Sequence, residues 1–318
     1  MSADPDVSVV MSVCNGAAAL RETVQSVLSQ ADFALELIVV NDGSTDETGE
    51  ILEDLAGLDS RVQVLSQKNQ GITAGLIRGC AIARGTYIAR QDVGDFSLDR
   101  RLYLQKLALD AALDLSFVSC WTEVRGPAKE FLSFSKGSGA ASTPIDIISE
   151  DARHGVIDGP AHHGSVMFRR DRYFQAGGYR SQFYFGQDWD LWYRLGEIGK
   201  FQMIEKVLYQ ACVTPNSLSG RYRNEQEAIA KFSHQALLRR RRGQPEDDLL
   251  EQAQRIRLSP AGSESAKLRA KGLYAIGEQL RRNGDPRAEV YFRDSLATSP
   301  TFLKPWLRIV QGRLRGKG

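Results

Sequence analysis

The chain has 318 residues, 42% hydrophobic and 25% charged, which is typical of a globular protein of one or two domains. This composition excludes wholesale disorder and collagen-like sequence. No apolar run approaches the roughly 20 residues of a membrane span. The acidic start lacks the basic region of a secretory signal, so export is not expected. The four widely spaced cysteines are interpreted as reduced thiols of a cytosolic protein.

Charge divides the chain into two parts. Residues 1–220 carry 20 Lys and Arg against 28 Asp and Glu, a net charge of −8, whereas residues 221–318 carry 21 against 11, a net charge of +10. Such a shift predicts two units with different surfaces, divided at residue 220. The basic second part alone would also suit a nucleic acid, but the acidic first part argues against a nucleic-acid-binding protein as a whole. The basic second part suits an acidic partner or an anionic membrane, so peripheral attachment at the inner face of a membrane is one expectation for a cytoplasmic chain.

Strand-like and helical segments alternate over the first 121 residues. Ser44 or Thr45 is the predicted N-cap of the second helix. The alternation predicts a mainly parallel, doubly wound α/β sheet. Strands are predicted at Val7–Val13, Leu35–Val40, Val62–Leu65, Tyr87–Ala89 and Leu115–Trp121, and helices at Ala18–Gln30, Ile51–Leu55, Ile72–Ala83 and Leu98–Leu113.

The remaining elements are less regular up to residue 220 and helical after it. Strands are predicted at Ser165–Phe168 and Leu208–Val213, helices at Arg170–Ala176 and Asp188–Leu195, and a loop at Gly137–Ser142. The basic part then contains helices at Asn224–Arg242, Asp247–Arg257, Glu264–Arg282 and Lys304–Leu314.

One stretch of this basic helical domain, residues 273–300, resembles a tetratricopeptide repeat, and an ordinary helical hairpin is the alternative. A single repeat cannot bury its own apolar face, so it is expected to pack on the preceding helices or on a protein partner. The residues that match the repeat are Leu273, Ile276, Gly277, Leu280, Ala288, Phe292 and Pro300.

Polar residues follow each of the first four predicted strands, and ligands of doubly wound sheets bind beyond the carboxyl ends of the strands. Repeated acidic groups there suit a divalent metal, ribose hydroxyls or a base N–H. No G-x-G-x-x-G follows the first strand and no G-x-x-x-x-G-K-[ST] occurs, which disfavours a dinucleotide fold and excludes a P-loop. These polar segments are Asn15, Asn41–Asp42, Gln67–Gln70 and Gln91–Asp95.

Six segments together resemble a known family. They are Val9–Asn15, Leu37–Asp46, Gly85–Asp92, His163–Arg169, Gly177–Tyr179 and Gln187–Trp192. In this order and spacing they are similar to the motifs of the inverting family-2 glycosyltransferases, over roughly residues 7–220. The resemblance implies a GT-A, Rossmann-like α/β fold and a hexosyltransferase that moves a sugar from a nucleotide diphosphate donor to a hydroxyl acceptor, as in surface polysaccharide or glycan assembly.

The same resemblance implies roles for individual residues. Asp42 would accept a hydrogen bond from the base or ribose of the donor, and Asn15 would contribute to the same donor site. Arg90 would lie near the diphosphate. Asp92 opens the family's D-x-D metal motif, which holds Mn²⁺ or Mg²⁺. Asp188 closes the pair E-D and would be the general base. A uridine diphosphate sugar is the first candidate donor, and a glycan or lipid-linked glycan is the expected acceptor.

Each role has a simpler alternative in the residues themselves. Asp42 precedes Gly-Ser-Thr and would also end a strand or stabilise a turn. Asp188 would also be an ordinary acidic residue at a helix start, and Arg90 a structural ion-pair partner. His162 and His163 are either ordinary loop histidines or functional residues.

Several residues depart from the family pattern, and two of them, Gly94 and Thr214, put the metal in question. Gly94 stands where the family has its second metal-motif aspartate, and Asp95 is the candidate substitute one residue on. Thr214 stands where the family often has a histidine, and Gln187 replaces the acidic neighbour of the base. Ile77 replaces a frequent asparagine. The alternative function is therefore a catalytically degenerate domain that binds nucleotide sugars or acts as a scaffold. A nucleotidyltransferase is disfavoured, because the first strand is not followed by a Gly-rich basic loop.

Overall fold

The computed structural model describes residues 4–30, 32–137, 159–184, 186–215, 223–256 and 266–315. The chain forms two compact units. The first comprises Met1–Thr122, Ser135–Ala211 and Ala228–Arg257, and the second comprises Glu123–Phe134, Cys212–Glu227 and Leu258–Gly318. Sequence analysis placed a single boundary at residue 220. By its contacts, however, Ala228–Arg257 belongs to the first unit, in which Ile229 and Leu237 are buried.

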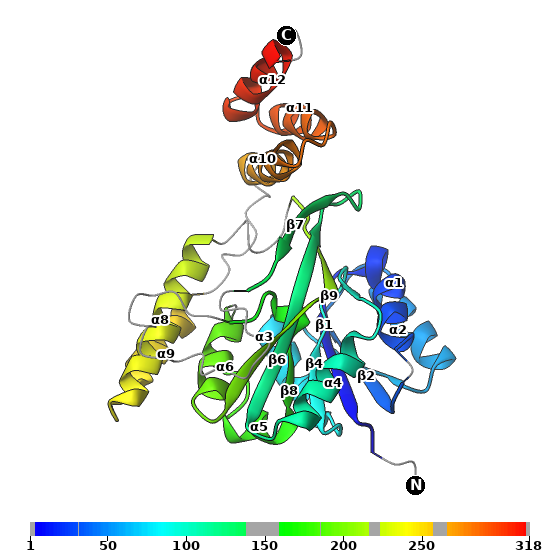
Figure 1. Cartoon of the computed structure of the whole chain (residues 1–318), viewed down its shortest axis with the longest axis vertical. Helices are drawn as coiled ribbons and strands as arrows, with labels where there is room; N and C mark the ends of the chain where they lie inside the picture. The colour runs from blue at the N-terminus through cyan, green and yellow to red at the C-terminus, as the bar shows by residue number, and fades with distance from the viewer. Residues whose placement is uncertain are drawn as a thin grey trace. The chain divides into compact units, whose positions relative to one another are not determined.

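Four parallel strands occupy one half of the sheet in the first unit (Figure 1): β1 (Val7–Val13), β2 (Leu35–Asp42), β3 (Val62–Gln67) and β4 (Tyr87–Arg90). β2 and β4 flank β1, and β3 pairs with β2. All seven residues of β1 are buried, as expected for a strand covered on both faces. The register aligns Val13 with Asn41 and Asp42 with Gln67, so these strands end at one edge.

The other half of the sheet contains antiparallel pairs. β8 (Met167–Arg169) runs antiparallel to β4 and to β6 (Leu115–Arg125), and β5 (Phe96–Ser97) runs antiparallel to β9 (Lys200–Cys212). The strand order is β3-β2-β1-β4-β8-β6-β9-β5. The predicted GT-A-like α/β fold is thereby confirmed, with a mixed sheet in place of a mainly parallel one. Apolar periodicity indicates that a strand exists but not its direction.

Helices cover both faces of this sheet because successive strand residues point to opposite sides. Val10 and Ile38 lie in one core with residues of α3 (Ile72–Ile82) and α6 (Gln187–Gly196). Val9 and Leu37 lie in the other core with α1 (Ala17–Leu28), α2 (Thr48–Leu58) and α4 (Arg101–Ala111). Three further helices are α5 (Arg170–Gln175), α8 (Arg223–Arg241) and α9 (Asp247–Arg255).

The predicted cap of the second helix is wrong. α2 begins at Thr48, its N-cap residue is Glu47, and Glu47 makes no side-chain capping bond. Ser44 instead accepts a hydrogen bond from the backbone of the β1–α1 loop, because the loops after β1 and β2 lie together.

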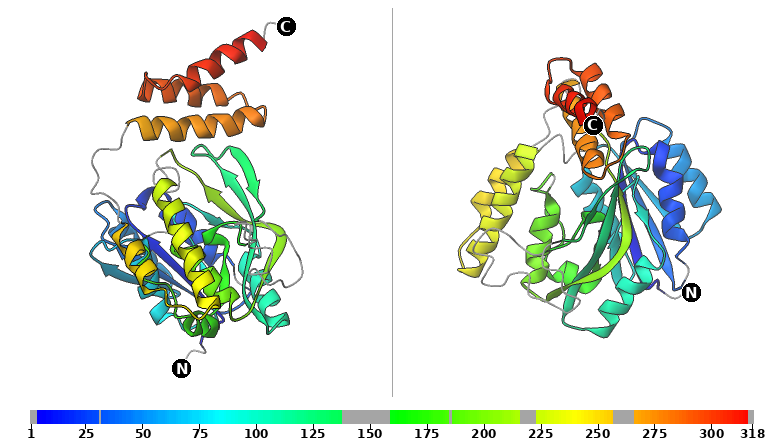
Figure 2. Two further views of the ribbon diagram at one scale, coloured as in Figure 1. Left: turned by 90° about the vertical axis from the view of Figure 1, so that its left-hand side faces the viewer. Right: turned by 45° about the horizontal axis from the view of Figure 1, so that its top comes forward.

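The second unit contains α10 (Ala266–Arg282), α11 (Ala288–Thr298) and α12 (Lys304–Arg315), which lie side by side in both views of Figure 2. It also contains most of β7 (Phe131–Ser135), which pairs with β6. A Cβ on Gly277 would lie 2.7 Å from the Phe292 ring, so α10 and α11 approach closely there. The likeness to a tetratricopeptide repeat stays a prediction. The buried core of this unit consists of Leu132, Ile276, Leu280, Ala288 and Phe292.

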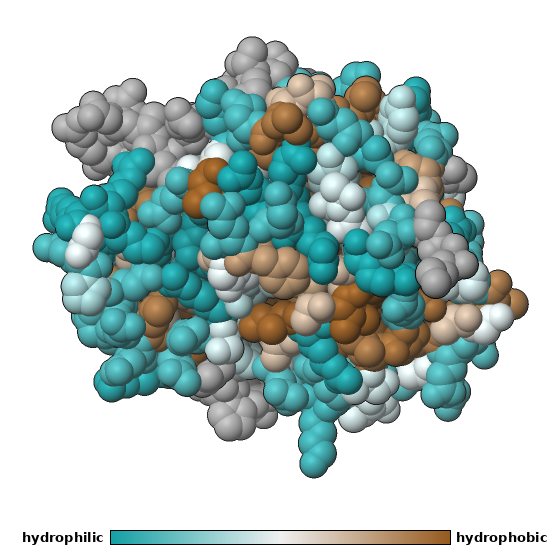
Figure 3. Space-filling view, turned by 90° about the horizontal axis from the view of Figure 1, so that it is seen from below, coloured by the Kyte–Doolittle hydropathy of each residue, from teal (hydrophilic) through white to brown (hydrophobic). Residues whose placement is uncertain are grey.

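The surface shown in Figure 3 carries several separate hydrophobic areas among hydrophilic side chains. Within the described residues, no helix combines the length and the apolar character needed to cross a membrane. The predicted loop at Gly137–Ser142 lies almost wholly outside the described residues.

Candidate active site

Asp42 ends β2 and is almost completely buried, with 2% of its surface exposed. One carboxylate oxygen accepts from Gln67 Nε2 and from the backbone N–H of Gln70, both at 2.8 Å, and the other accepts from the N–H of Gly71 at 2.8 Å. The carboxylate therefore stabilises the β3–α3 loop, whereas the simpler alternative concerned the turn that directly follows Asp42. Its predicted contact with the donor nucleotide stays a prediction.

Asn15 joins the two loops that follow β1 and β2. Its backbone is left-handed, with φ of 57°, a conformation that Asn tolerates better than most residues. Its Oδ1 accepts the N–H of Thr45 at 2.8 Å, and its own N–H donates to Ser44 Oγ at 2.9 Å. Asn15 thus holds the shape of the edge beside Asp42, where the sequence analysis placed it.

Arg90 and Asp92 form an ion pair at the end of β4. Arg90 is 1% exposed, and its Nε has no hydrogen-bond partner in the described part of the chain. Burial opposes ionisation of Asp92, but Arg90, followed by His163 and His162, outweighs burial and lowers the pKa of Asp92. Asp92 is therefore an anion at neutral pH, beside a buried cation that still has one N–H to donate.

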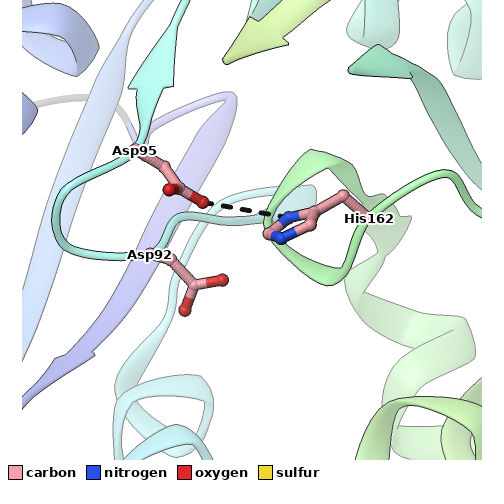
Figure 4. Close-up of side chains that lie close together, drawn as sticks. All are labelled: Asp92, Asp95 and His162. Atoms are coloured by element: carbon pink, nitrogen blue, oxygen red, sulfur yellow. Dashed lines mark ion pairs between the residues drawn. The ribbon is translucent and has the colours of Figure 1, made fainter. Parts of the chain in front are cut away.

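Asp92, Asp95 and His162 come together, with one potential ligand atom of each lying within 4.8 Å of the others (Figure 4). Asp95 Oδ2 lies 3.8 Å from His162 Nδ1 and accepts from the Tyr209 hydroxyl at 2.9 Å. Burial lowers the pKa of His162 and so favours the neutral imidazole, the form that binds metals.

The spacing of these three groups fits a divalent cation. Ligands about 2.1 Å from one ion lie roughly 3 to 4 Å apart, so a small closure of the cluster would suffice. Carboxylate oxygens with an imidazole nitrogen suit Mn²⁺ and similar ions. His162 Nδ1 now accepts the Gly164 N–H at 3.1 Å, a bond that ligation through Nδ1 would replace.

Gly94 and Thr214, which depart from the family pattern, have different surroundings. Gly94 has φ of +90°, a conformation that residues with a side chain rarely adopt, so the loop here is shaped around glycine. Thr214 belongs to the second unit and is exposed. The candidate substitutes at the cluster are Asp95, which was predicted as a metal ligand, and His162, for which no specific role was predicted.

Arg101 and Tyr209 were missed by the sequence analysis. Arg101 is fully buried, and its Nη2 donates to the backbone oxygens of Arg90 and Gly164, both at 2.7 Å. Its other N–H groups donate to Gln91 Oε1, Ser97 Oγ and Gln105 Oε1. Arg101 therefore ties the β4–β5 loop to the turn that holds His162. Its sequence position resembles that of any helical arginine, so no local signal could have revealed it.

Asp188 lies in the first turn of α6, after Gly186, whose φ of 70° starts the helix. Burial raises the pKa of Asp188 to about 6, the Trp189 N–H lowers it in part, and the charge of Asp92 raises it further. The effect of Asp92 on this pKa indicates that the two carboxylates share one region.

The segment before α6 also meets the loop that Asp42 stabilises. Thr73 Oγ1 donates to the backbone oxygen of Tyr184 at 3.1 Å, and a Cβ on Gly71 would lie 2.6 Å from the Tyr184 ring. The carboxyl edge of the sheet and the start of α6 are thus joined through this loop.

The sheet, the acidic edge and the carboxylate on α6 define the class of GT-A-type glycosyltransferases. The sequence model of "Glycosyl transferase family 2" matches residues 8–171. The chain belongs to glycosyltransferase family 2.

Curated relatives agree with this assignment. The "Putative glycosyltransferase EpsE" of Bacillus subtilis is 30% identical over 217 residues, which cover 66% of this chain and 74% of that protein. The "Chondroitin synthase" of Pasteurella multocida is 27% identical over 210 residues, 64% of this chain. The matched region spans only 20% of that synthase, so the similarity concerns a part of a longer protein.

Solved structures support the fold. Staphylococcus aureus TarS 1–349 in complex with UDP superposes with a TM-score of 0.55 at 15% identity, covering 93% of this chain and 81% of that one. The same TarS region in complex with UDP-GlcNAc gives a TM-score of 0.54 at 13% identity, covering 98% of this chain and 92% of that one. At such identities the likeness concerns the fold alone.

Proposed function

We propose that the chain transfers a hexose from a nucleoside diphosphate sugar to an acceptor hydroxyl, with inversion at the anomeric carbon. Family membership supports glycosyl transfer. The observation that carries the proposal is Asp188, a carboxylate with a pKa raised to about 6 beside the charges of Asp92 and Arg90. Such a group is ionised at neutral pH and is a stronger base than an ordinary carboxylate, as a general base requires.

The reaction is a single displacement. The acceptor hydroxyl oxygen attacks the anomeric carbon, the bond from that carbon to the diphosphate oxygen breaks, and the hydroxyl proton passes to Asp188. The nucleoside diphosphate leaves with the bonding electron pair. Arg90, which pairs with Asp92, is the proposed source of positive charge near the diphosphate.

We place a divalent cation, Mn²⁺ or Mg²⁺, on Asp92 and Asp95, with His162 as the third ligand. Such an ion, when bound, offsets negative charge on the leaving diphosphate. Asp42 and Asn15 would receive the base or ribose at the other end of the donor, where Asp42 fixes the loop after β3.

The donor and acceptor are proposed from the comparisons. A uridine diphosphate sugar is the first candidate, since TarS was solved with UDP and with UDP-GlcNAc. Relatives named as chondroitin and hyaluronan synthases support a role in surface polysaccharide or glycan assembly, with a glycan or lipid-linked glycan as acceptor. Work in the cytoplasm and a protein partner for the C-terminal helices remain predictions.

The test is donor turnover by the full chain with a panel of nucleotide sugars, with Mn²⁺ and with chelator. We expect one donor to be hydrolysed or transferred, and chelation to suppress turnover. Asp188→Asn should lower turnover by roughly 10²- to 10⁴-fold with the donor affinity retained. Asp54→Asn, at a surface aspartate that is 62% exposed, is the control and should change nothing. Full activity of Asp188→Asn would refute the assignment of the base.

The second candidate function is a degenerate domain that binds nucleotide sugars or serves as a scaffold. The replacements at Gly94 and Thr214 favour it. Calorimetry with uridine and guanosine diphosphates separates the two, because metal-dependent binding followed by turnover supports the enzyme. Binding without turnover of any donor would support the degenerate domain, and no nucleotide binding would leave only the scaffold.

A further inference from the structure

Helix α12 has two apolar sides, of which its own unit covers only one. Ile309 packs against the core of the second unit, and Pro305 is buried. Leu303, just before the helix, is 67% exposed, Trp306 is 55% exposed and Leu307 is 54% exposed. With Val310 they follow the spacing i, i+3, i+4, i+7, so they form one continuous stripe. We call these four residues the α12 stripe.

The segment around the stripe is strongly basic. In α10 and α11, several arginines pair with carboxylates of their own helix, as Arg281 does with Glu278 and Arg293 with Glu289. Residues 295–318 contain no Asp or Glu, and their basic residues are Lys304, Arg308, Arg313, Arg315 and Lys317. Of these, Arg308 pairs with Glu278 of α10 at 2.7 Å.

We propose that the α12 stripe binds the surface of an anionic lipid bilayer, lying in the plane of the interface. Trp306 and the two leucines would enter the boundary between headgroups and acyl chains, and the basic residues of this segment would attract anionic headgroups. Tryptophan favours this boundary because its ring is apolar while its N–H stays hydrated. The proposal is independent of sugar transfer, and it would bring the chain to a surface where lipid-linked acceptors lie.

The charge of this segment favours an anionic bilayer over a second copy of the chain as the partner of the α12 stripe. Pairing two α12 stripes would bring two segments without carboxylates together, and like charges across an interface oppose association. An anionic bilayer supplies both the apolar layer and the opposite charge. Each Lys or Arg close to such a surface is expected to raise the affinity for it about fivefold.

The test is co-sedimentation of the full chain with vesicles of phosphatidylcholine alone and of phosphatidylcholine mixed with phosphatidylglycerol. We expect binding to the mixed vesicles, weakened by salt, and little binding to the neutral ones. Leu303→Ser with Leu307→Ser should lower the partition coefficient about tenfold or more, because less apolar surface is buried. Lys304→Gln should lower it about fivefold.

Val290→Ser is the matched control, since Val290 is 56% exposed on the neighbouring helix α11. It should bind vesicles as the parent chain does, and thermal unfolding should show that all variants are folded. Equal binding to both vesicle types would overturn the role of charge. No vesicle binding, or a dimer in light scattering that the double serine variant abolishes, would overturn the proposal and assign the stripe to another partner.

Discussion

The end of β2 and the first turn of α6 each carry an aspartate, but the two carboxylates have different hydrogen-bond environments. Asp42 accepts three hydrogen bonds from the loop after β3. Asp188 is only partly exposed, the hydrogen bonds to its side chain within the described residues come from the backbone N–H groups of Trp189 and of Asp188 itself, and burial raises its pKa to about 6. A carboxylate that is fully hydrogen-bonded stabilises structure, whereas one left short of donors is held ready to take a proton.

The largest effect expected from this contrast is on turnover. Asp188→Asn should lower kcat by roughly 10²- to 10⁴-fold, the usual contribution of a general base. In the parent chain, kcat should fall about tenfold for each pH unit below about 6, because only ionised Asp188 accepts the proton. Although burial opposes it, Arg90 lowers the pKa of Asp92, so Asp92 stays ionised as pH falls through 6.

A pH–rate profile at saturating metal and donor measures how kcat falls below about pH 6. Asp188→Asn should give a flat profile over the same range. A parent profile without a step near pH 6 would argue that a different group accepts the proton.

The two aspartates should also affect stability in opposite directions. Asp42→Asn leaves backbone N–H groups with a poorer acceptor and should destabilise the fold by about 2 kcal/mol. Asp188 has a folded-state pKa above its unfolded value, so its ionisation costs stability as pH rises from about 4 to about 6. Asp188→Asn should therefore stabilise the fold by about 2 kcal/mol at neutral pH, allowing for its partial exposure.

Urea unfolding of the two variants at pH 7 and near pH 4 checks the sign of each change in the free energy of unfolding. The gain from Asp188→Asn should shrink at the lower pH, where the parent carboxyl is protonated. Loss of stability in both variants at pH 7 would remove the contrast between the two sites.

The sequence predicted the α/β fold and the approximate place of most strands because these depend on local apolar patterns. β1 is one example, since its seven residues are buried and its bounds match the prediction. The directions of the strands beyond β4 depend on long-range pairing within the sheet. The cap of α2 depends on contact between the loops after β1 and β2. Local patterns could predict neither. The same limit explains why Asp95 was found by its nearness to Asp92, whereas His162, 67 residues beyond Asp95, was not assigned to the metal.

Adjacent histidines offer a sharper test of the metal cluster. His162 faces Asp95, whereas the Nε2 of His163 is engaged with the Tyr179 hydroxyl at 2.9 Å. His162→Asn should weaken Mn²⁺ binding by at least the roughly 10- to 100-fold that loss of a hydrogen-bond partner of a metal ligand causes. His163→Asn is the matched control and should retain Mn²⁺ affinity.

Electron paramagnetic resonance of free and bound Mn²⁺ gives this affinity without any need for turnover. Equal affinity in the two variants would remove His162 from the ligand set. The Mn²⁺ affinity of Asp95→Asn would then show whether Asp95 is a ligand.

The smallest effect concerns Gly94, where the loop between Asp92 and Asp95 turns. A Cβ there would contact only Ala19 Cβ, at 3.9 Å, so space is available and the obstacle is the backbone, with φ of +90°. Gly94→Ala should cost about 1 kcal/mol of stability, measured by urea unfolding. Gly94→Asp should carry a similar cost and should not tighten Mn²⁺ binding, because the loop is built around a conformation that aspartate disfavours. Tighter binding without lost stability would instead show that the loop readily adopts the family's usual metal motif.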